Sequence, residues 1–122
     1  MINLKTLVNS FRYASKGISY SFKENQNIKI HITLGVLVIL FGLLLGFTRY
    51  ELFAVSLLSI FVISAEMINS AIEEVVDLLV DEHNEHARIA KDVSAGMVLI
   101  IAIFAIIIGF FVFIPHIISL FG

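Results

Sequence analysis

Three long apolar runs constrain this chain more than any other feature of its sequence. They cover residues 30–47, 52–65 and 93–114, and none of them contains Lys, Arg, Asp or Glu. A helix needs about 20 mainly apolar residues to cross a hydrocarbon core of about 30 Å. The helical pattern of the second run continues through Glu66 and Glu73 to about Val80, beyond the apolar zone. We therefore expect membrane-spanning helices at residues 30–47, 52–72 and 93–114, with Pro115 ending the third.

The composition supports a single integral-membrane domain over residues 1–122. Hydrophobic residues make up 59% of the chain and charged residues only 15%, whereas soluble domains are about a quarter charged. The polar connections are short: a break at residues 23–27, a turn at 48–51 and a charged connection at 81–92. Because the chain has no Cys, it contains neither disulfides nor cysteine metal sites. The fold class we expect is an all-α membrane protein.

The first 27 residues form a separate amphipathic segment that ends in the polar break. Within residues 3–23, apolar side chains recur at three- and four-residue spacing, with Lys and Arg on the other side. A basic amphipathic helix of this kind lies in the membrane interface with its apolar face down. The alternative is an ordinary helix that packs on a neighbour.

The distribution of Lys and Arg indicates the orientation in the membrane. Five of the eight lie in residues 1–29, only Arg49 lies in the first connection, and Arg88 and Lys91 lie in the second. Positive residues accumulate on the cytoplasmic side of membrane proteins. The N-terminus and the second connection should therefore be cytoplasmic, and the C-terminus should face outward.

Polar residues form a stripe along the second predicted span. At 100° per residue they share one helix face. They are Glu66, Asn69, Ser70, Glu73 and Asp77. A carboxylate at the edge of the apolar zone is costly unless it is paired, protonated or bound to a cation, so Glu66 is a candidate functional residue. The alternative is a structural hydrogen-bond ladder, although three acids on one stripe repel unless a divalent cation or a Lys lies between them.

Lys91 and Asp92 open the third span and are followed by the small residues Ser94, Ala95 and Gly96. Lys91 is placed to meet the acidic stripe; the alternative is a solvated helix end. No Gly-rich nucleotide-binding loop is present, so a nucleotide would have to be held by side chains and a metal. His83 and His86 are only a weak indication of a metal site, and we interpret both as loop residues.

The run AEMINSAIEEVVD at residues 65–77, followed by Ala90-Lys91-Asp92 and Ala95-Gly96, closely resembles the prokaryotic diacylglycerol kinase family, which includes undecaprenol kinases. The resemblance extends to Tyr13, to residues 16–18 and to residues 27–31. It covers almost the whole chain, and the pattern E-x-x-N-[ST]-A-I-E-x-x-V-D with a later A-K-D is specific.

The resemblance implies a homotrimeric enzyme of the bacterial inner membrane, built as a trimeric helical bundle with interfacial helices. It would transfer the γ-phosphoryl of MgATP to the hydroxyl of a membrane lipid alcohol, with Mg²⁺ as cofactor. Its partners would be ATP, the lipid alcohol and the bilayer, and no nucleic acid. Residues 27–31 and 113–115 look more like the undecaprenol side of the family, but diacylglycerol remains open as the acceptor.

The resemblance also implies residue roles. Glu66 would be the catalytic base and, with Ala95, would contact the lipid, while Glu73 would bind the metal. Glu73 is also implied to contact ATP. The other residues implied to contact ATP are Tyr13, Asn25, Asn69, Asp77, Glu82, His83, Asn84, Lys91 and Asp92.

Two positions depart from the family pattern. Where the family often has a second metal-binding Glu, this chain has Asn25, with Glu24 beside it. Three alternatives follow. Asn25 supplies a neutral ligand to the metal, a small shift of the helix brings in Glu24 instead, or one metal contact is lost. The usual His-Pro of the second connection is replaced by Asn84-Glu85.

Two other classes of protein compete with a lipid kinase. A small membrane transporter could use a membrane Glu for protons or cationic substrates, but it would need a polar pathway through the outer half of the chain. A non-catalytic membrane subunit would not need Glu66, Asn69, Glu73 and Lys91 together.

Overall fold

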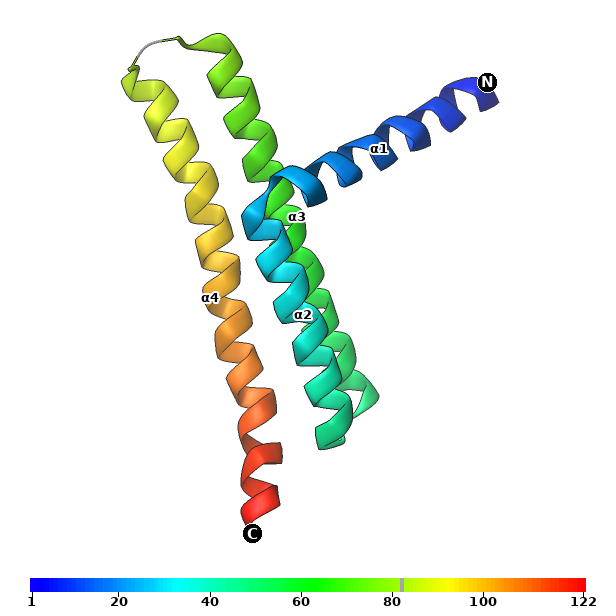
Figure 1. The fold of residues 1–122 in the computed structure, drawn as a ribbon, viewed down its shortest axis with the longest axis vertical. Helices are drawn as coiled ribbons and strands as arrows, with labels where there is room; N and C mark the ends of the chain where they lie inside the picture. Colours follow the sequence, from blue (N-terminus) through cyan, green and yellow to red (C-terminus); the bar gives the residue numbers. More distant parts are fainter. Residues whose placement is uncertain (82) are drawn as a thin grey trace.

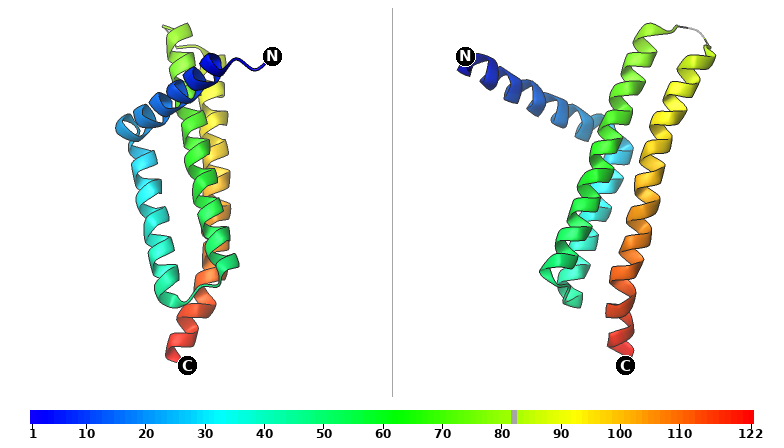
Figure 2. Two further views of the ribbon diagram at one scale, coloured as in Figure 1. Left: turned by 90° about the vertical axis from the view of Figure 1, so that its right-hand side faces the viewer. Right: turned by 180° about the vertical axis from the view of Figure 1, so that it is seen from behind.

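The computed structural model describes residues 1–81 and 83–122. These residues form four helices: α1 (Leu4–Glu24), α2 (Gln26–Leu45), α3 (Arg49–Leu79) and α4 (Glu85–Phe121). Helices α2, α3 and α4 run side by side as a bundle, while α1 projects from it at a steep angle (Figure 1; Figure 2). Each of the three bundle helices is long and apolar enough to cross a membrane. The prediction of an all-α chain with three helices able to span a membrane is therefore confirmed.

Single capping residues make the first two turns shorter than the sequence indicated. Instead of a five-residue break, Asn25 alone separates α1 from α2, and its side-chain oxygen accepts from the backbone N–H groups of Asn27 and Ile28. Asn is among the best helix N-caps because its short side chain reaches these free donors. The predicted polar turn at 48–51 is also too long. Gly46 ends α2 in the left-handed conformation (φ 82°), and Thr48 caps α3 in a capping box with Glu51.

Helix α4 exceeds its predicted limits at both ends. It begins at Glu85 rather than Val93, because Asn84 caps it and Arg88 pairs with Glu85 (2.5 Å) and Asp92 (2.8 Å) along the helix. The 81–92 connection is correspondingly shorter, and His86 belongs to the helix rather than to a loop. Pro115 lies inside the helix and does not end it. Proline removes one backbone donor, a loss that membrane helices tolerate.

Helix α3 is the centre of the bundle. It packs against both α2 and α4, whereas α2 and α4 scarcely touch each other. The buried positions of α3 share one face, since they are spaced by three, four or seven residues with one neighbouring pair. They are Val55, Val62, Ala65, Glu66 and Asn69. Most large apolar side chains of the bundle are exposed, as expected for helices whose surroundings are apolar.

The turn between α2 and α3 is fastened to α4 by aromatic and polar contacts. The Phe47 ring packs edge-on against Phe113 and beside His116, with ring centroids 4.8 Å apart in both pairs. His116 Nε2 lies 2.9 Å from Glu51 Oε2, which also accepts from the Thr48 backbone N–H. These contacts close the end of the bundle that lies far from α1.

Helix α1 is joined to the bundle through a small contact area. None of its residues is buried, which argues against the alternative that α1 packs on a neighbour within the chain. The Tyr20 hydroxyl donates to Glu74 Oε1 on α3 (3.2 Å). The charge of Glu74 and this hydrogen bond raise the pKa of the Tyr20 phenol, so the hydroxyl remains a donor at neutral pH.

We predict that Gly42→Ala destabilises the bundle by about 1–3 kcal/mol, the usual cost of overpacking. A Cβ atom at Gly42 would lie 2.6 Å from Cδ2 of Phe47, and the ring cannot move without disturbing its contacts with Phe113 and His116. Unfolding in detergent micelles measures the effect. Gly109→Ala is the control, because a Cβ there meets no atom within 4 Å. Equal stability of the two variants would contradict the packing.

Candidate active site

One hydrogen bond shows where the polar stripe of α3 lies relative to the junction between α1 and α2. The side-chain amide of Asn25, between α1 and α2, donates to the hydroxyl of Ser70 on α3. At 1.5 Å per residue, Glu66 lies about 6 Å from Ser70 toward the apolar part of the helix. Asp77 lies about 10 Å from Ser70 in the other direction, where α3 extends past the junction (Figure 1). The stripe therefore runs from the apolar zone into the polar end of the bundle.

Glu66 is buried, with only 4% of its surface exposed. Its Oε1 lies 3.6 Å from Nε2 of His31 on α2. Its Oε2 is also buried, and no other described residue donates a hydrogen bond to it. Buried polar atoms without a partner are rare because they are costly. The burial of this oxygen is therefore not compensated by any described residue.

Asn69 links the stripe to α4. Its amide nitrogen donates to Glu73 Oε1 (3.0 Å), and its amide oxygen accepts from the Ser94 hydroxyl (2.6 Å). Asn69 and Ser94 are both buried, at 8% and 4% exposure. Because Ser94 occupies the oxygen of Asn69, the amide nitrogen is directed at Glu73, which is itself exposed. Ser94 thus orients the acidic stripe.

Lys91 forms an ion pair with Asp77 across α4 and α3. The prediction that Lys91 meets the acidic stripe is confirmed. Both side chains are partly exposed, at 39% and 65%, so the pair contributes little to stability. Its charge nevertheless reduces the repulsion among the acids of the stripe. Asp92 is bound differently, in the exposed network with Arg88.

Several predicted site residues are not brought to the stripe by the described contacts. Tyr13 is 66% exposed on α1, and its ring lies 5.9 Å from Nζ of Lys16 on the same helix. The side chain of Asn84 caps α4, and His83 and Ala95 are exposed. Glu82 lies outside the described residues. Glu24 is exposed, and its charge acts on Tyr20.

His31 and Ser94 have no assigned role in the sequence analysis. The signal for His31 was present, because it is a titratable side chain inside the first apolar run. Nothing in the sequence paired it with Glu66, 35 positions away. Ser94 stands out in the sequence only as a small residue next to Ala95 and Gly96.

The oxygen ligands of this site suit a metal ion that is bound together with the phosphates of a nucleotide better than a metal ion held by the protein alone. No cluster of three or more His, Cys, Asp or Glu side chains in residues 1–81 and 83–122 is arranged to hold a metal. Mg²⁺ is usually held by one or two carboxylates together with substrate phosphates and water. Glu73 can supply one carboxylate. The side-chain oxygen of Asn25 already accepts two backbone N–H groups of α2.

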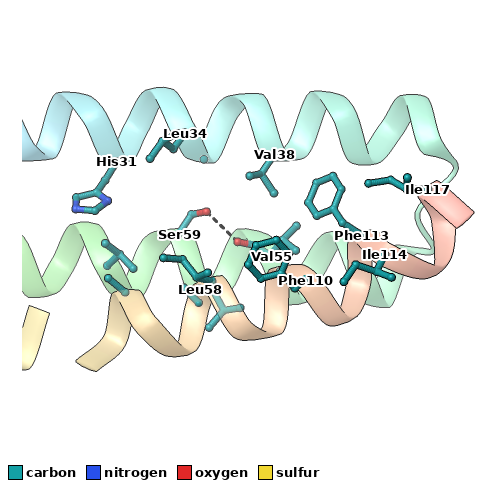
Figure 3. A pocket seen from close by; sticks show the side chains of 16 residues that line it. His31, Leu34, Val38, Val55, Leu58, Ser59, Phe110, Phe113, Ile114 and Ile117 are labelled. Atoms are coloured by element: carbon teal, nitrogen blue, oxygen red, sulfur yellow. Dashed lines mark hydrogen bonds between the residues drawn. The ribbon is translucent and has the colours of Figure 1, made fainter. Parts of the chain in front are cut away.

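An apolar cavity of about 560 Å³ lies between α2, α3 and α4. It extends from His31, whose Nε2 lies 3.6 Å from Glu66 Oε1, to Phe113 and Ile117 in α4 (Figure 3). Ser59 is the other polar side chain in its lining, and its hydroxyl is bonded to the carbonyl of Val55 (2.9 Å). The space beyond His31 is therefore suited to hydrocarbon rather than to ions.

Comparisons with known proteins identify the family of the chain. The profile of the prokaryotic diacylglycerol kinase family matches residues 12–113. A diacylglycerol kinase of Synechocystis sp. is 43% identical over 115 residues, which are 93% of this chain and 66% of that protein. An undecaprenol kinase of Bacillus subtilis is 34% identical over 112 residues, covering 92% of this chain and 91% of that protein.

A diacylglycerol kinase of Haemophilus influenzae is 31% identical over 97 residues, covering 80% of this chain and 82% of that protein. The family profile covers α2, α3 with the whole polar stripe, and α4 as far as residue 113. The chain therefore belongs to the prokaryotic diacylglycerol kinase family.

Proposed function

We propose that the chain transfers the γ-phosphoryl of MgATP to the hydroxyl of a membrane lipid alcohol. One observation carries this proposal. One buried oxygen of Glu66 has no hydrogen-bond partner among the described residues and lies at the apolar end of the stripe, whose polar end holds Glu73 and Asp77, with Lys91 of α4 paired to Asp77. A lipid hydroxyl would meet Glu66 at the apolar end of this stripe, and a nucleotide would meet the charged side chains at its polar end.

The proposed roles follow from what phosphoryl transfer requires, namely positioning, charge neutralisation and an oriented nucleophile. Glu66 accepts the proton of the lipid hydroxyl as the hydroxyl oxygen attacks the γ-phosphorus, and the bond from that phosphorus to the β–γ bridging oxygen breaks, so that ADP leaves. Glu73, oriented by Asn69, holds Mg²⁺, which when bound neutralises phosphate oxygens. Lys91 offsets the charge of the nucleotide. Family resemblance adds Tyr13, Glu82, His83, Asn84 and Asp92 around ATP, and Ala95 near the lipid.

The setting in the membrane is also part of the proposal. The exposed, basic α1 supports a helix lying in the interface, and the Lys and Arg distribution supports a cytoplasmic N-terminus in the bacterial inner membrane. The homotrimer is proposed from the family resemblance. A transporter is disfavoured, because the lining of the cavity beyond His31 is almost wholly apolar.

The acceptor that we favour is undecaprenol, on the resemblance of residues 27–31 and 113–115. Purified protein in mixed micelles should consume ATP only when a lipid alcohol is present. Undecaprenol and diacylglycerol, compared side by side, identify the acceptor from the lipid phosphate formed. ATP consumption with neither lipid would contradict the proposed function.

Replacing Glu66 tests the base. Glu66→Gln should keep fold and oligomeric state but lower transfer by about a hundredfold or more, because an amide does not accept the proton. Lipid phosphate formation and circular dichroism are measured together. Glu74→Gln, a neighbouring substitution outside the stripe, should keep parental activity. Near-parental turnover in folded Glu66→Gln would refute the assignment.

Replacing Glu73 tests the metal site. Glu73→Gln should raise the Mg²⁺ and ATP concentrations needed for half-maximal rate, in addition to lowering the rate, because a neutral amide binds a hard cation more weakly. Magnesium titrations of the variant and of Glu74→Gln provide the measurement. Overlapping curves for Glu73→Gln and the parent would show that Glu73 is not a ligand.

Substitutions that change the charge at Asn25 or Glu24 test which of the two side chains binds the metal. We expect Asn25→Glu to tighten Mg²⁺-dependent ATP binding, since it adds a carboxylate beside Ser70, and Glu24→Ala to have little effect. Loss of the α2 cap costs about 0.5–2 kcal/mol in Asn25→Glu, so Asn25→Asp, which keeps a capping oxygen, is the control.

Magnesium-dependent ATP affinity distinguishes three cases for this pair. If Glu24→Ala weakens binding and Asn25→Glu harms it, Glu24 serves the metal instead. If neither substitution changes the affinity, neither side chain reaches the metal.

A further inference from the structure

We propose that His31 is a positioning residue for Glu66, holding one carboxylate oxygen so that the other is presented to the acceptor hydroxyl. The inference deepens the proposed lipid-kinase function and rests on it. It assigns a role to a side chain on α2 in a site whose other residues lie mainly on α3 and α4.

The contact between the two residues crosses helices and is largely buried. Nε2 of His31 lies 3.6 Å from Oε1 of Glu66, and the side chains are 24% and 5% exposed. This separation is an ion-pair distance and is longer than a hydrogen bond. Contacts of catalytic groups are often long without substrate and shorten when it binds. A small movement would bring the imidazole into hydrogen-bond range.

The two oxygens of Glu66 have different surroundings. Oε1 faces the imidazole, whereas Oε2 is buried without a hydrogen-bond partner among the described residues. A carboxylate held at one oxygen loses its freedom to rotate, so the second oxygen points in a fixed direction. We assign proton acceptance to this oxygen, which has no hydrogen-bond partner among the described residues.

His31 also separates Glu66 from the apolar cavity. The imidazole lies at one end of the cavity lining (Figure 3), and Ser59, the other polar side chain there, is bonded to its own helix. A carboxylate next to bare hydrocarbon would be strongly disfavoured. The imidazole therefore both shields and orients Glu66, and no described residue of α4 in this lining offers a charged substitute.

The first experiment compares His31→Phe with His31→Gln. We expect His31→Phe to lower kcat by about tenfold to a hundredfold, the scale on which misplaced reacting groups act, with KM for ATP unchanged. His31→Gln, whose amide can still donate to Glu66, should recover most of the rate. Thr33→Val is the control, because the exposed Thr33 hydroxyl donates to the backbone carbonyl of Lys29 in its own helix and to no other described residue.

The second experiment places His31→Phe in the Glu66→Gln background. If His31 acts through Glu66, the double variant is no slower than Glu66→Gln alone, since residues that act as a unit are not additive. Losses that multiply in the double variant would overturn the inference. So would a folded His31→Gln as slow as His31→Phe, or a change confined to KM.

A third measurement does not depend on turnover. The ¹⁵N signals of the His side chains can be recorded in micelles, with His31 assigned by its loss in His31→Gln. The His31 signal should move in Glu66→Gln and stay in place in Glu74→Gln; an unmoved signal in Glu66→Gln would overturn the contact. If the parent protein phosphorylates no lipid alcohol, the proposed function fails and His31 has no catalytic role, whereas the contact with Glu66 is judged by this signal alone.

Discussion

Burial of the Glu66 carboxylate between membrane helices is the constraint on which the site depends. An ionised group in this position is costly unless its surroundings compensate for the lost water. Here an imidazole lies 3.6 Å from one carboxylate oxygen, and the other oxygen has no hydrogen-bond partner among the described residues. The close approach of α2 and α3 makes this possible, and Gly35 supports it, because a Cβ there would lie 3.1 Å from the Ser59 hydroxyl oxygen.

The rest of the site is organised by contacts between α3 and α4. Ser94 orients Asn69, Asn69 in turn binds Glu73, and Lys91 pairs with Asp77. These contacts become more exposed along the stripe, from a buried hydrogen bond to a partly solvated ion pair. The protein therefore presents a gradient from hydrocarbon to water along one helix face, which suits a reaction between a lipid and a nucleotide.

The far end of the bundle is held by contacts that do not include the stripe. Phe47 packs against α4 while Glu51 binds His116, and Gly42 leaves room for the aromatic ring. Helix α4 continues beyond Pro115 to take part in this closure. The two ends are thus stabilised separately, and substitutions at the far end should affect stability before they affect the proposed chemistry of Glu66.

The sequence by itself determined the three spanning helices, the amphipathic first helix and the polar stripe, because hydropathy and helical period are sums over neighbouring residues. It misplaced helix ends near Asn25, Thr48, Asn84 and Pro115, since each depends on one side chain satisfying or removing backbone hydrogen bonds. Only the tertiary structure paired His31 with Glu66 and Ser94 with Asn69. Such pairs depend on how far each helix is rotated and shifted along its neighbour, and packing over the whole bundle decides that.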